Sequence, residues 1–286
     1  MRTPDSIMDV EPPCPTIVDI CDFARHIRLG ALDAIAAAGL GHVGGDFSVA
    51  DILAVLYGGT LRVNPVDPTW AGRDRLVLSK GHAAASLYTA LALRGFFPVD
   101  ELCTFAGPDS RLGGHPNRRK TPGVETNTGP LGHGLPIAVG MATGARLAGA
   151  DWATYVVVGD GEMQEGSNWE AIMFAAHRGL SNLTLLVDRN RLQQGAGTEE
   201  TNALEPLDEK LAAFGWATTV VDGHDVAALD AAMKAPRAHG RPVAIVANTV
   251  KGKGVSFMEN RSEWHHKVPS SEQVEQAISE LTGVVL

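Results

Sequence analysis

Tyr155-Val-Val-Val158 runs directly into Gly159-Asp-Gly-Glu162, and no other stretch defines the fold as strongly. The β-branched run predicts a short buried strand, after which the Asp160 carboxylate stands between two glycines. Glycine lets the backbone approach a ligand closely, and open α/β sheets bind ligands at the carboxyl ends of their strands. The stretch is not a dinucleotide fingerprint, because the third glycine of G-x-G-x-x-G would fall on Gln164. Taken alone, an Asp between two glycines is more often an ordinary turn.

A second predicted strand ends in a matching polar loop. Leu185-Leu-Val-Asp188 leads into Arg189 and Asn190, and one predicted helix separates this strand from the first. The two loops should therefore leave adjacent strands side by side. A carboxylate from Asp160 and an amide oxygen from Asn190 suit Mg²⁺ or Ca²⁺, which prefer hard oxygen ligands. Two side chains cannot enclose either ion, so diphosphate oxygens and water would complete the coordination shell.

Strand-like and helix-like segments alternate along the second half of the chain, which predicts an α/β fold: a mostly parallel sheet with helices on both faces. Strands are expected at 75–79, 154–158, 183–187, 217–221 and 243–247. Helices are expected at 17–38, 49–56, 83–94, 137–147, 168–179, 207–214 and 225–234, with Ser48 capping the second. No repeat or linker interrupts residues 17–286, so we expect a single domain. A proline-containing flexible arm over residues 1–16 precedes it.

Two segments leave alternatives open. Residues 106–136 are rich in Gly, Pro, Asn and Thr without an apolar period, which indicates either a functional loop or disorder. The helix that follows carries several small residues, for which we expect one face that allows a second subunit to approach closely. The alternative is that this face packs on the chain's own sheet. The small residues are Ala138, Gly140, Ala142, Gly144 and Ala145.

Composition excludes several classes of protein. The 286 residues carry a formal charge of −9, which argues against a nucleic-acid or anionic-membrane partner. A hydrophobic fraction of 44% with 20% charged residues is typical of a soluble globular protein. No apolar run reaches the roughly 20 residues of a membrane span, and the first residues lack an apolar signal core. The three cysteines form no C-x-x-C pair, so we expect a reduced, cytoplasmic protein.

Five segments, in order, resemble motifs of the transketolase family, and together with the Asn190 loop they cover about residues 20–270. They are Gly41–Gly45, Leu78–His82, Gly114–Pro116, Gly123–Gly132 and Gly159–Gly166. The resemblance implies the thiamine-diphosphate-binding fold, and specifically the domain that holds the diphosphate. The family's second domain, which binds the aminopyrimidine and supplies its activating glutamate, has no room in 286 residues. The chain therefore looks like the N-terminal subunit of a split transketolase, most simply assembled with its partner as α₂β₂.

The resemblance also assigns roles to individual residues. Asp160 and Asn190 would hold Mg²⁺ or Ca²⁺ by their side chains, and Leu192 by its backbone carbonyl. Gly161 and Glu162 would contact the diphosphate through backbone amides. The full set of cofactor-binding residues implied is His82, Gly129, Pro130, Leu131, Gly159, Asp160, Gly161, Glu162, Glu165 and Asn190. Glu165 would couple the two cofactor sites across the subunit interface.

Histidines are the expected catalytic residues. His42, His82 and His115 match the family's active-site histidines, and imidazole titrates near neutral pH, as proton transfer from sugar hydroxyls requires. His265 and His266 both lie near the place of a further active-site histidine, and the sequence does not separate them. A single histidine beside a glycine is more often a turn or solvated residue, but three such residues precede predicted helices. Four others are assigned to structure: His26, His177, His224 and His239.

Three further features depart from the family or remain ambiguous. His133 stands where the family usually has Gln, and Arg189 and Arg191 flank Asn190 where relatives often carry a second Asn or Gly. Lys251-Gly-Lys-Gly254 either faces a phosphate or forms a solvated basic turn. Arg118-Arg-Lys120 is interpreted as a solvated loop.

The implied activity is transfer of a two-carbon ketol unit from a ketose, expected to be phosphorylated, to an aldose acceptor. One alternative is the alpha subunit of a 2-oxoacid dehydrogenase, and another is a non-catalytic cofactor-binding subunit. Transketolase is favoured by the three histidines His42, His82 and His115 and by the segment Gly123-Val-Glu-Thr-Asn-Thr-Gly-Pro-Leu-Gly132. The sequence leaves open the sugar pair, the pathway and the metal used in vivo.

Overall fold

Five parallel strands form the centre of the molecule, in the order β1-β2-β3-β7-β6. The computed structural model describes residues 19–236 and 240–284. The strands are β1 (Arg75–Leu78), β2 (Thr154–Gly159), β3 (Leu183–Arg189), β6 (Ala217–Asp222) and β7 (Val243–Asn248). The predicted parallel α/β sheet is confirmed, and the expected arm over residues 1–16 lies outside the described residues.

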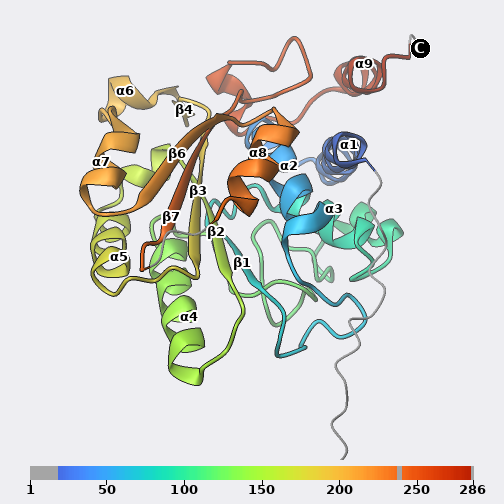
Figure 1. Ribbon diagram of the computed structural model, residues 1–286. Helices are drawn as coiled ribbons and strands as arrows, with labels where there is room; N and C mark the ends of the chain where they lie inside the picture. The colour runs from blue at the N-terminus through green and yellow to red at the C-terminus, as the bar shows by residue number, and fades with distance from the viewer. Residues whose placement is uncertain (1–18, 237–239, 285–286) are drawn as a thin grey trace, which may run out of the picture.

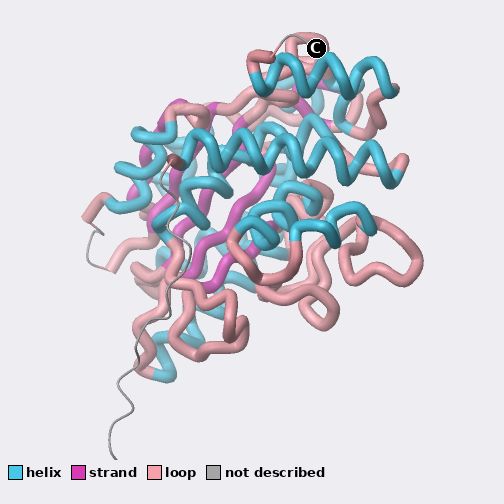
Figure 2. Tube along the Cα trace, turned by 90° about the vertical axis from the view of Figure 1, so that its right-hand side faces the viewer, coloured by secondary structure: helices cyan, strands magenta, loops and turns pink. Residues whose placement is uncertain are grey.

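Helices cover both faces of this sheet (Figure 1). On one face lie α1 (Ile20–Ala38), α2 (Val43–Val55), α3 (Ala84–Leu93), α8 (Val226–Lys234) and α9 (Ser271–Thr282). On the other lie α4 (Gly134–Ala148), α5 (Gly166–His177) and α7 (Leu207–Ala213). Figure 2 views the molecule from the side of the first layer, whose helices lie in front of the strands.

Alternate residues of each strand enter different cores. Tyr155 and Val157 of β2 pack under α1, α2 and α3, whereas Val156 and Val158 pack under α4 and α5. Successive side chains of a strand point to opposite faces, and a parallel sheet is buried on both, so an unbroken apolar run is required. This requirement explains why the apolar runs of β2 and β3 predicted these strands so clearly.

Helix α2 begins six residues before its predicted start, and the expected Ser48 cap is wrong. Ser48 lies inside the helix, where its hydroxyl donates to the Gly45 carbonyl at 3.1 Å and to Asp188 Oδ2 at 2.6 Å. Gly44 and Gly45 suggested a loop, since helical glycine is unfavourable. Tertiary packing requires one of them, because a Cβ on Gly44 would lie 2.7 Å from the Trp264 carbonyl oxygen.

The irregular segment 106–136 is anchored to the core by hydrogen bonds. Tyr88 Oη donates to the carbonyls of Gly113 at 2.9 Å and His115 at 3.0 Å. Arg73 forms a bidentate pair with Glu125 at 2.7 and 2.8 Å. These contacts favour the functional-loop interpretation over disorder.

The small residues of α4 do not form one face. Ala138, Ala142 and Ala145 are fully buried against the sheet, whereas Gly140 and Gly144 lie on the exposed side with no atom within 4 Å of an added Cβ. At 100° per residue these positions cannot all share a stripe. The expected single Gly/Ala face is therefore wrong, and the exposed side of α4 also carries Ile137 and Leu147.

Two of the three cysteines, Cys21 and Cys103, are free thiols, whereas Cys14 lies outside the described residues. Within residues 19–236 and 240–284, no helix combines the length and hydropathy needed to cross a membrane.

Gly134 and Gly140 provide a matched test of how α4 packs. A Cβ on Gly134 would lie 2.8 Å from Ser79 Cα at the end of β1, so we expect Gly134→Ala to destabilise the chain by about 1–3 kcal/mol. Gly140→Ala adds the same methyl group in open space and should stabilise the isolated chain by up to about 1 kcal/mol. Denaturant unfolding measures both changes, and a fully stable Gly134→Ala variant would contradict the close approach of α4 to β1.

Candidate active site

The loops after β2 and β3 meet at one cavity of about 340 Å³. Gly159 pairs with Asp188 in the parallel ladder, so Asp160 and Asn190 leave adjacent strands at the same edge. Strand β3 extends two residues beyond its predicted end and includes Arg189. The cavity is lined by Lys80, His82, Leu131, Gly159, Asp160, Gly161, Glu162, Gln164, Glu165, Asn190, Leu192, Gln193, Gln194, Lys251 and His265.

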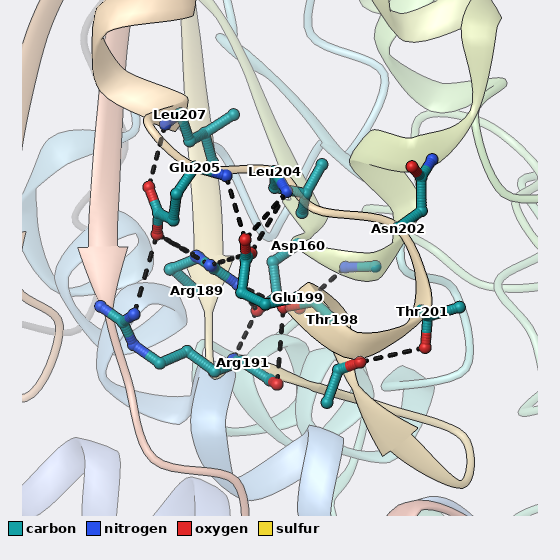
Figure 3. A network of polar contacts seen from close by, with 12 residues as sticks. Asp160, Arg189, Arg191, Thr198, Glu199, Thr201, Asn202, Leu204, Glu205 and Leu207 are labelled. Carbon is teal, nitrogen blue, oxygen red and sulfur yellow. Dashed lines mark hydrogen bonds and ion pairs between the residues drawn. The ribbon is translucent and has the colours of Figure 1, made fainter.

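Asp160 is only 1% exposed, and its carboxylate is held by three donors. Oδ1 accepts the Gly161 N–H at 2.8 Å, and Oδ2 accepts the Arg191 N–H at 2.5 Å and Arg189 Nη1 at 3.0 Å (Figure 3). Burial raises the pKa of the Asp160 carboxyl, the neighbouring Asp188 raises it further, and Arg189 opposes both. A carboxylate has about four acceptor positions, so it retains capacity for a cation.

Asn190 and Leu192, the other two predicted metal ligands, line the same cavity as Asp160. Asn190 is 4% exposed and its Oδ1 accepts the Leu192 N–H at 3.1 Å. Leu192 begins the hairpin of β4 (Leu192–Gln193) and β5 (Ala196–Gly197). Within the described residues, no group of three or more His, Cys, Asp or Glu side chains could hold a metal ion. One carboxylate, one amide and one carbonyl around a shared cavity therefore fit the open, diphosphate-completed site that the sequence predicts.

The side chain of Glu162 connects residues 129–132 to the sheet. We call this segment the cofactor loop, because the resemblance implies that it contacts the cofactor. Its carboxylate accepts the N–H groups of Gly132 at 2.9 Å and Gly159 at 3.1 Å, and it also accepts the Ser79 hydroxyl. Burial raises the pKa of Glu162, while the Ser79 and backbone donors lower it. Glu162 thus anchors the loop that ends in Leu131 and Gly132, a role that its predicted backbone contact to a diphosphate did not include.

Four of the predicted catalytic histidines cluster at one end of the cavity. The His42 ring lies 5.1 Å from His82, 5.6 Å from His265 and 4.7 Å from His266, measured between ring centroids. His82 and His265 lie 5.2 Å apart. The structure therefore brings both His265 and His266 to the cluster, and of the two it is His265 that lines the cavity. His115 lies beside the cofactor loop instead, with its ring 3.4 Å from where a Gly129 Cβ would be.

Burial favours the neutral form of His42, His82 and His265. It lowers the pKa of His42 to about 4 and that of His265 to about 3, and it holds the pKa of His82 well below its ordinary range. Burial also lowers the pKa of His115. Nearby cations act in the same direction: Lys80 and Lys251 disfavour a further positive charge on His42. Neutral imidazoles can accept protons from hydroxyl groups.

Two buried lysines face the cavity: Lys80, to which the sequence assigned no role, and Lys251, for which it left open a phosphate contact or a solvated turn. Lys80 donates to the Gly45 carbonyl at 2.9 Å and pairs with Asp188 at 2.5 Å. Lys251 Nζ lies 3.0 Å from His265 Nδ1, and burial lowers its pKa to about 8. Lys253, on the same glycine loop, is exposed and pairs with Glu259 at 3.6 Å. Only Lys251 of that loop thus faces the cavity; the position of Lys80, just after a strand, was the available signal.

Other predicted residues lie at the periphery or in structural roles. Glu165 is exposed at the start of α5 on the cavity lining, and His133 is exposed at the start of α4. His224 is structural, as expected: its Nδ1 lies 2.6 Å from Asp51 Oδ2 and its Nε2 accepts the Val250 N–H at 2.8 Å. His26 and His177 lie in helices α1 and α5, as expected, and both are exposed. The 118–120 run is exposed, as expected, and His239 lies outside the described residues.

Comparison with known proteins supports the class that this sheet and cavity define, a thiamine diphosphate binding domain. Residues 21–283 match the family described as "Transketolase, thiamine diphosphate binding domain". The chain belongs to the transketolase family.

Similar curated proteins are subunits of comparable length. One subunit of the apulose-4-phosphate transketolase of Actinobacillus succinogenes is 45% identical over 260 residues, covering 90% of this chain and 94% of that protein. The 6-deoxy-6-sulfo-D-fructose transketolase subunit SqwG of a Clostridium species is 42% identical, covering 92% and 96%. These relatives favour the transketolase interpretation over the 2-oxoacid dehydrogenase alternative.

Solved transketolases share the fold. The Pichia stipitis enzyme in complex with sedoheptulose-7-phosphate superposes with a TM-score of 0.87 at 32% identity, covering 92% of this chain and 40% of that one. The Leishmania mexicana enzyme gives a TM-score of 0.87 at 33% identity, covering 93% and 42%. The chain thus spans about two fifths of these transketolases.

The pKa of His42 yields a prediction about pH. Its folded-state pKa of about 4 lies below the ordinary value of about 6.5, so the neutral form is favoured in the fold. The resulting contribution to stability is present above about pH 6.5 and is lost as the pH falls through about 4. In an NMR titration of the chain, the His42 ring signal, assigned from a His42→Gln variant, should shift with a midpoint near 4. A midpoint near 6.5 would show that the ring is solvated.

Proposed function

We propose that this chain is the diphosphate-binding subunit of a split transketolase, active only with a second polypeptide that carries the pyrimidine-binding domain. The complex would transfer a two-carbon ketol unit from a phosphorylated ketose to an aldose. The observation that carries the proposal is one cavity lined by Asp160, Asn190 and Leu192 and also by His82 and His265, two histidines whose pKa values are lowered by burial. Residues 17–286 would act as one domain, and the complex would work in the cytoplasm.

Thiamine diphosphate would bind in this cavity together with Mg²⁺ or Ca²⁺. The metal would be held by the side chains of Asp160 and Asn190 and by the Leu192 carbonyl. Gly159, Gly161 and Glu162 would contact the diphosphate through the backbone, and the loop Gly129-Pro130-Leu131 would contact the rings. Lys80 and Lys251, both buried in the cavity wall, supply positive charge toward a diphosphate. When bound, the cofactor supplies a nucleophilic carbon that carries the two-carbon unit.

The histidines would manage the protons of the sugar. His42, His82, His265 and His266 lie within one cluster, so several sugar hydroxyls can be contacted at once. Neutral rings can accept hydrogen bonds from sugar hydroxyls, and a general acid–base group contributes about 10²–10⁴-fold when its pKa lies near the working pH. His115 would contact the sugar from the loop side, and Glu165 would couple the site to its counterpart across the subunit interface.

Exposed apolar residues on α4 and α5 are the surface we assign to assembly. Leu147 is 84% exposed and Met173 58%, with Ile137 and Phe174 also exposed on the same two helices. Adjacent exposed apolar side chains mark interaction surfaces more often than isolated ones. This surface starts where the cofactor loop enters α4, which suits a site completed by another subunit. An α₂β₂ complex is the simplest assembly that meets these requirements.

Asp160→Ala should abolish metal-dependent cofactor binding and leave the fold intact. It removes the anionic metal ligand, while Arg189 keeps its ion pairs with Glu199 and Glu205. Calorimetric titration of thiamine diphosphate with Mg²⁺ into the assembled complex measures the affinity, and circular dichroism monitors the fold. Asp151→Ala, at an exposed carboxylate that pairs with Arg62, is the control and should bind normally. Normal affinity in Asp160→Ala would remove Asp160 from the site.

Turnover should require a second polypeptide. Ketol transfer from a ketose phosphate to an aldose, followed by product analysis, should be absent with this chain alone and present with the product of the adjacent reading frame. Light scattering should show self-association of the chain and a larger mixed complex. A strictly monomeric chain in both samples would contradict the split-enzyme proposal.

A further inference from the structure

We propose that Arg189 is a positioning residue for the metal site: its guanidinium fixes the Asp160 carboxylate and closes the base of the hairpin that carries Leu192. This inference rests on the metal site proposed above. It concerns an arginine that stands beside Asn190 where the family pattern does not call for one. Figure 3 shows the network of polar contacts that supports it.

All five N–H donors of this guanidinium are used, although its side chain is only 1% exposed. Nη1 donates to Asp160 Oδ2 at 3.0 Å and to Thr198 Oγ1 at 2.7 Å. Nη2 donates to Glu199 at 2.7 Å and to Glu205 at 2.8 Å, and Nε donates to Glu205 at 3.2 Å. A planar guanidinium whose five donors are all bound has a single orientation, so it also fixes the orientation of the Asp160 carboxylate.

The two glutamates extend the network into the following segment. Glu199 accepts the N–H groups of Leu204 at 3.2 Å and Glu205 at 3.3 Å. Glu205 in turn accepts the Leu207 N–H at 2.9 Å, at the start of α7. Arg189 is therefore held from α6 (Thr198–Thr201) to α7 as well as from the loop after β2.

Backbone hydrogen bonds beside this guanidinium close the hairpin. Thr198 donates its N–H to the Arg191 carbonyl at 3.0 Å, and Arg191 donates its own N–H to Asp160 Oδ2 at 2.5 Å. Between these two residues lie Leu192, Gln193 and Gln194, which line the cavity. Arg191 adopts a left-handed backbone with φ 66°, a conformation that a non-glycine residue keeps only where its surroundings enforce it. The Arg189 guanidinium thus contacts both the Asp160 carboxylate and Thr198, the residue whose N–H closes the hairpin that carries Leu192.

The charge balance argues that Arg189 does not exclude a cation. Asp160, Glu199 and Glu205 pair with Arg189, and Glu205 also pairs with Arg191 at 3.7 Å, so three carboxylates face two guanidinium groups and the cluster is net negative. If Arg189 competed with Mg²⁺ for Asp160, its removal would make Mg²⁺ binding tighter. If Arg189 positions Asp160, its removal should make Mg²⁺ binding weaker. Residues that orient metal ligands typically change metal affinity by about 10–100-fold when mutated.

The test is the Mg²⁺ dissociation constant of the assembled complex, titrated calorimetrically at saturating thiamine diphosphate. Arg189→Met should weaken Mg²⁺ binding by about 10–100-fold. Arg189→Lys keeps the charge but loses the planar set of five donors. Its Mg²⁺ dissociation constant should therefore be closer to that of Arg189→Met than to that of the wild type. Arg191→Met is the matched control: it removes a 58% exposed guanidinium from the same hairpin and keeps the backbone N–H to Asp160, so affinity should not change.

A second variant covers the case in which Arg189→Met does not fold. Glu199→Gln with Glu205→Gln changes side chains that are 40% and 41% exposed and leaves the Asp160–Arg189 pair in place. It should weaken Mg²⁺ binding less than Arg189→Met, because the guanidinium loses only its ion pairs with Glu199 and Glu205 and keeps the one with Asp160. Unchanged or tighter Mg²⁺ binding in Arg189→Met, or in the double variant if the former is unfolded, would overturn the inference. If the wild-type complex bound thiamine diphosphate without Mg²⁺, the proposed metal site would fail and this inference with it.

Discussion

The parallel pairing of β2 with β3 is the constraint on which the rest of the site depends. It places Gly159 opposite Asp188, so Asp160 and Asn190 leave the sheet side by side. Parallel strands bring all their carboxyl ends to one edge, and the loop after β1 arrives there too, carrying Lys80. The loops after β1, β2 and β3 therefore meet at one cavity, which Leu131, Lys251 and His265 also line.

Buried charge at this edge is stable only because each group has partners. Asp188 is paired with Lys80 and also accepts hydrogen bonds from Ser48 and Thr249, so its pKa falls despite full burial. Breaking one partner of such a pair would leave an uncompensated charge and cost about 3–5 kcal/mol. A site of this kind contributes little net stability. Under the proposed function, its charges are preorganised for an anionic cofactor.

The histidine cluster follows a different rule. The rings of His42, His82 and His265 pack against one another, and they are neutral because they are buried beside lysines. Cations and neutral imidazoles thus share the cavity, an arrangement suited to an anionic cofactor and to hydroxyl protons. Lys251 lies against this histidine cluster, with its amine 3.0 Å from His265 Nδ1.

Local patterns in the sequence determined the strands, most helices and the pairing of Asp160 with Asn190, because burial on both faces of a sheet leaves a continuous apolar signature. Only the tertiary structure explains why Gly44 stands inside α2, since a Cβ there would lie 2.7 Å from the carbonyl oxygen of Trp264, more than two hundred residues away. It also separated the alanines of α4 from its glycines and gave Lys80 a partner 108 residues distant. These contacts join residues that are remote in sequence. Hydrophobic periodicity indicates that a position is buried, but it does not predict which distant residue that position contacts.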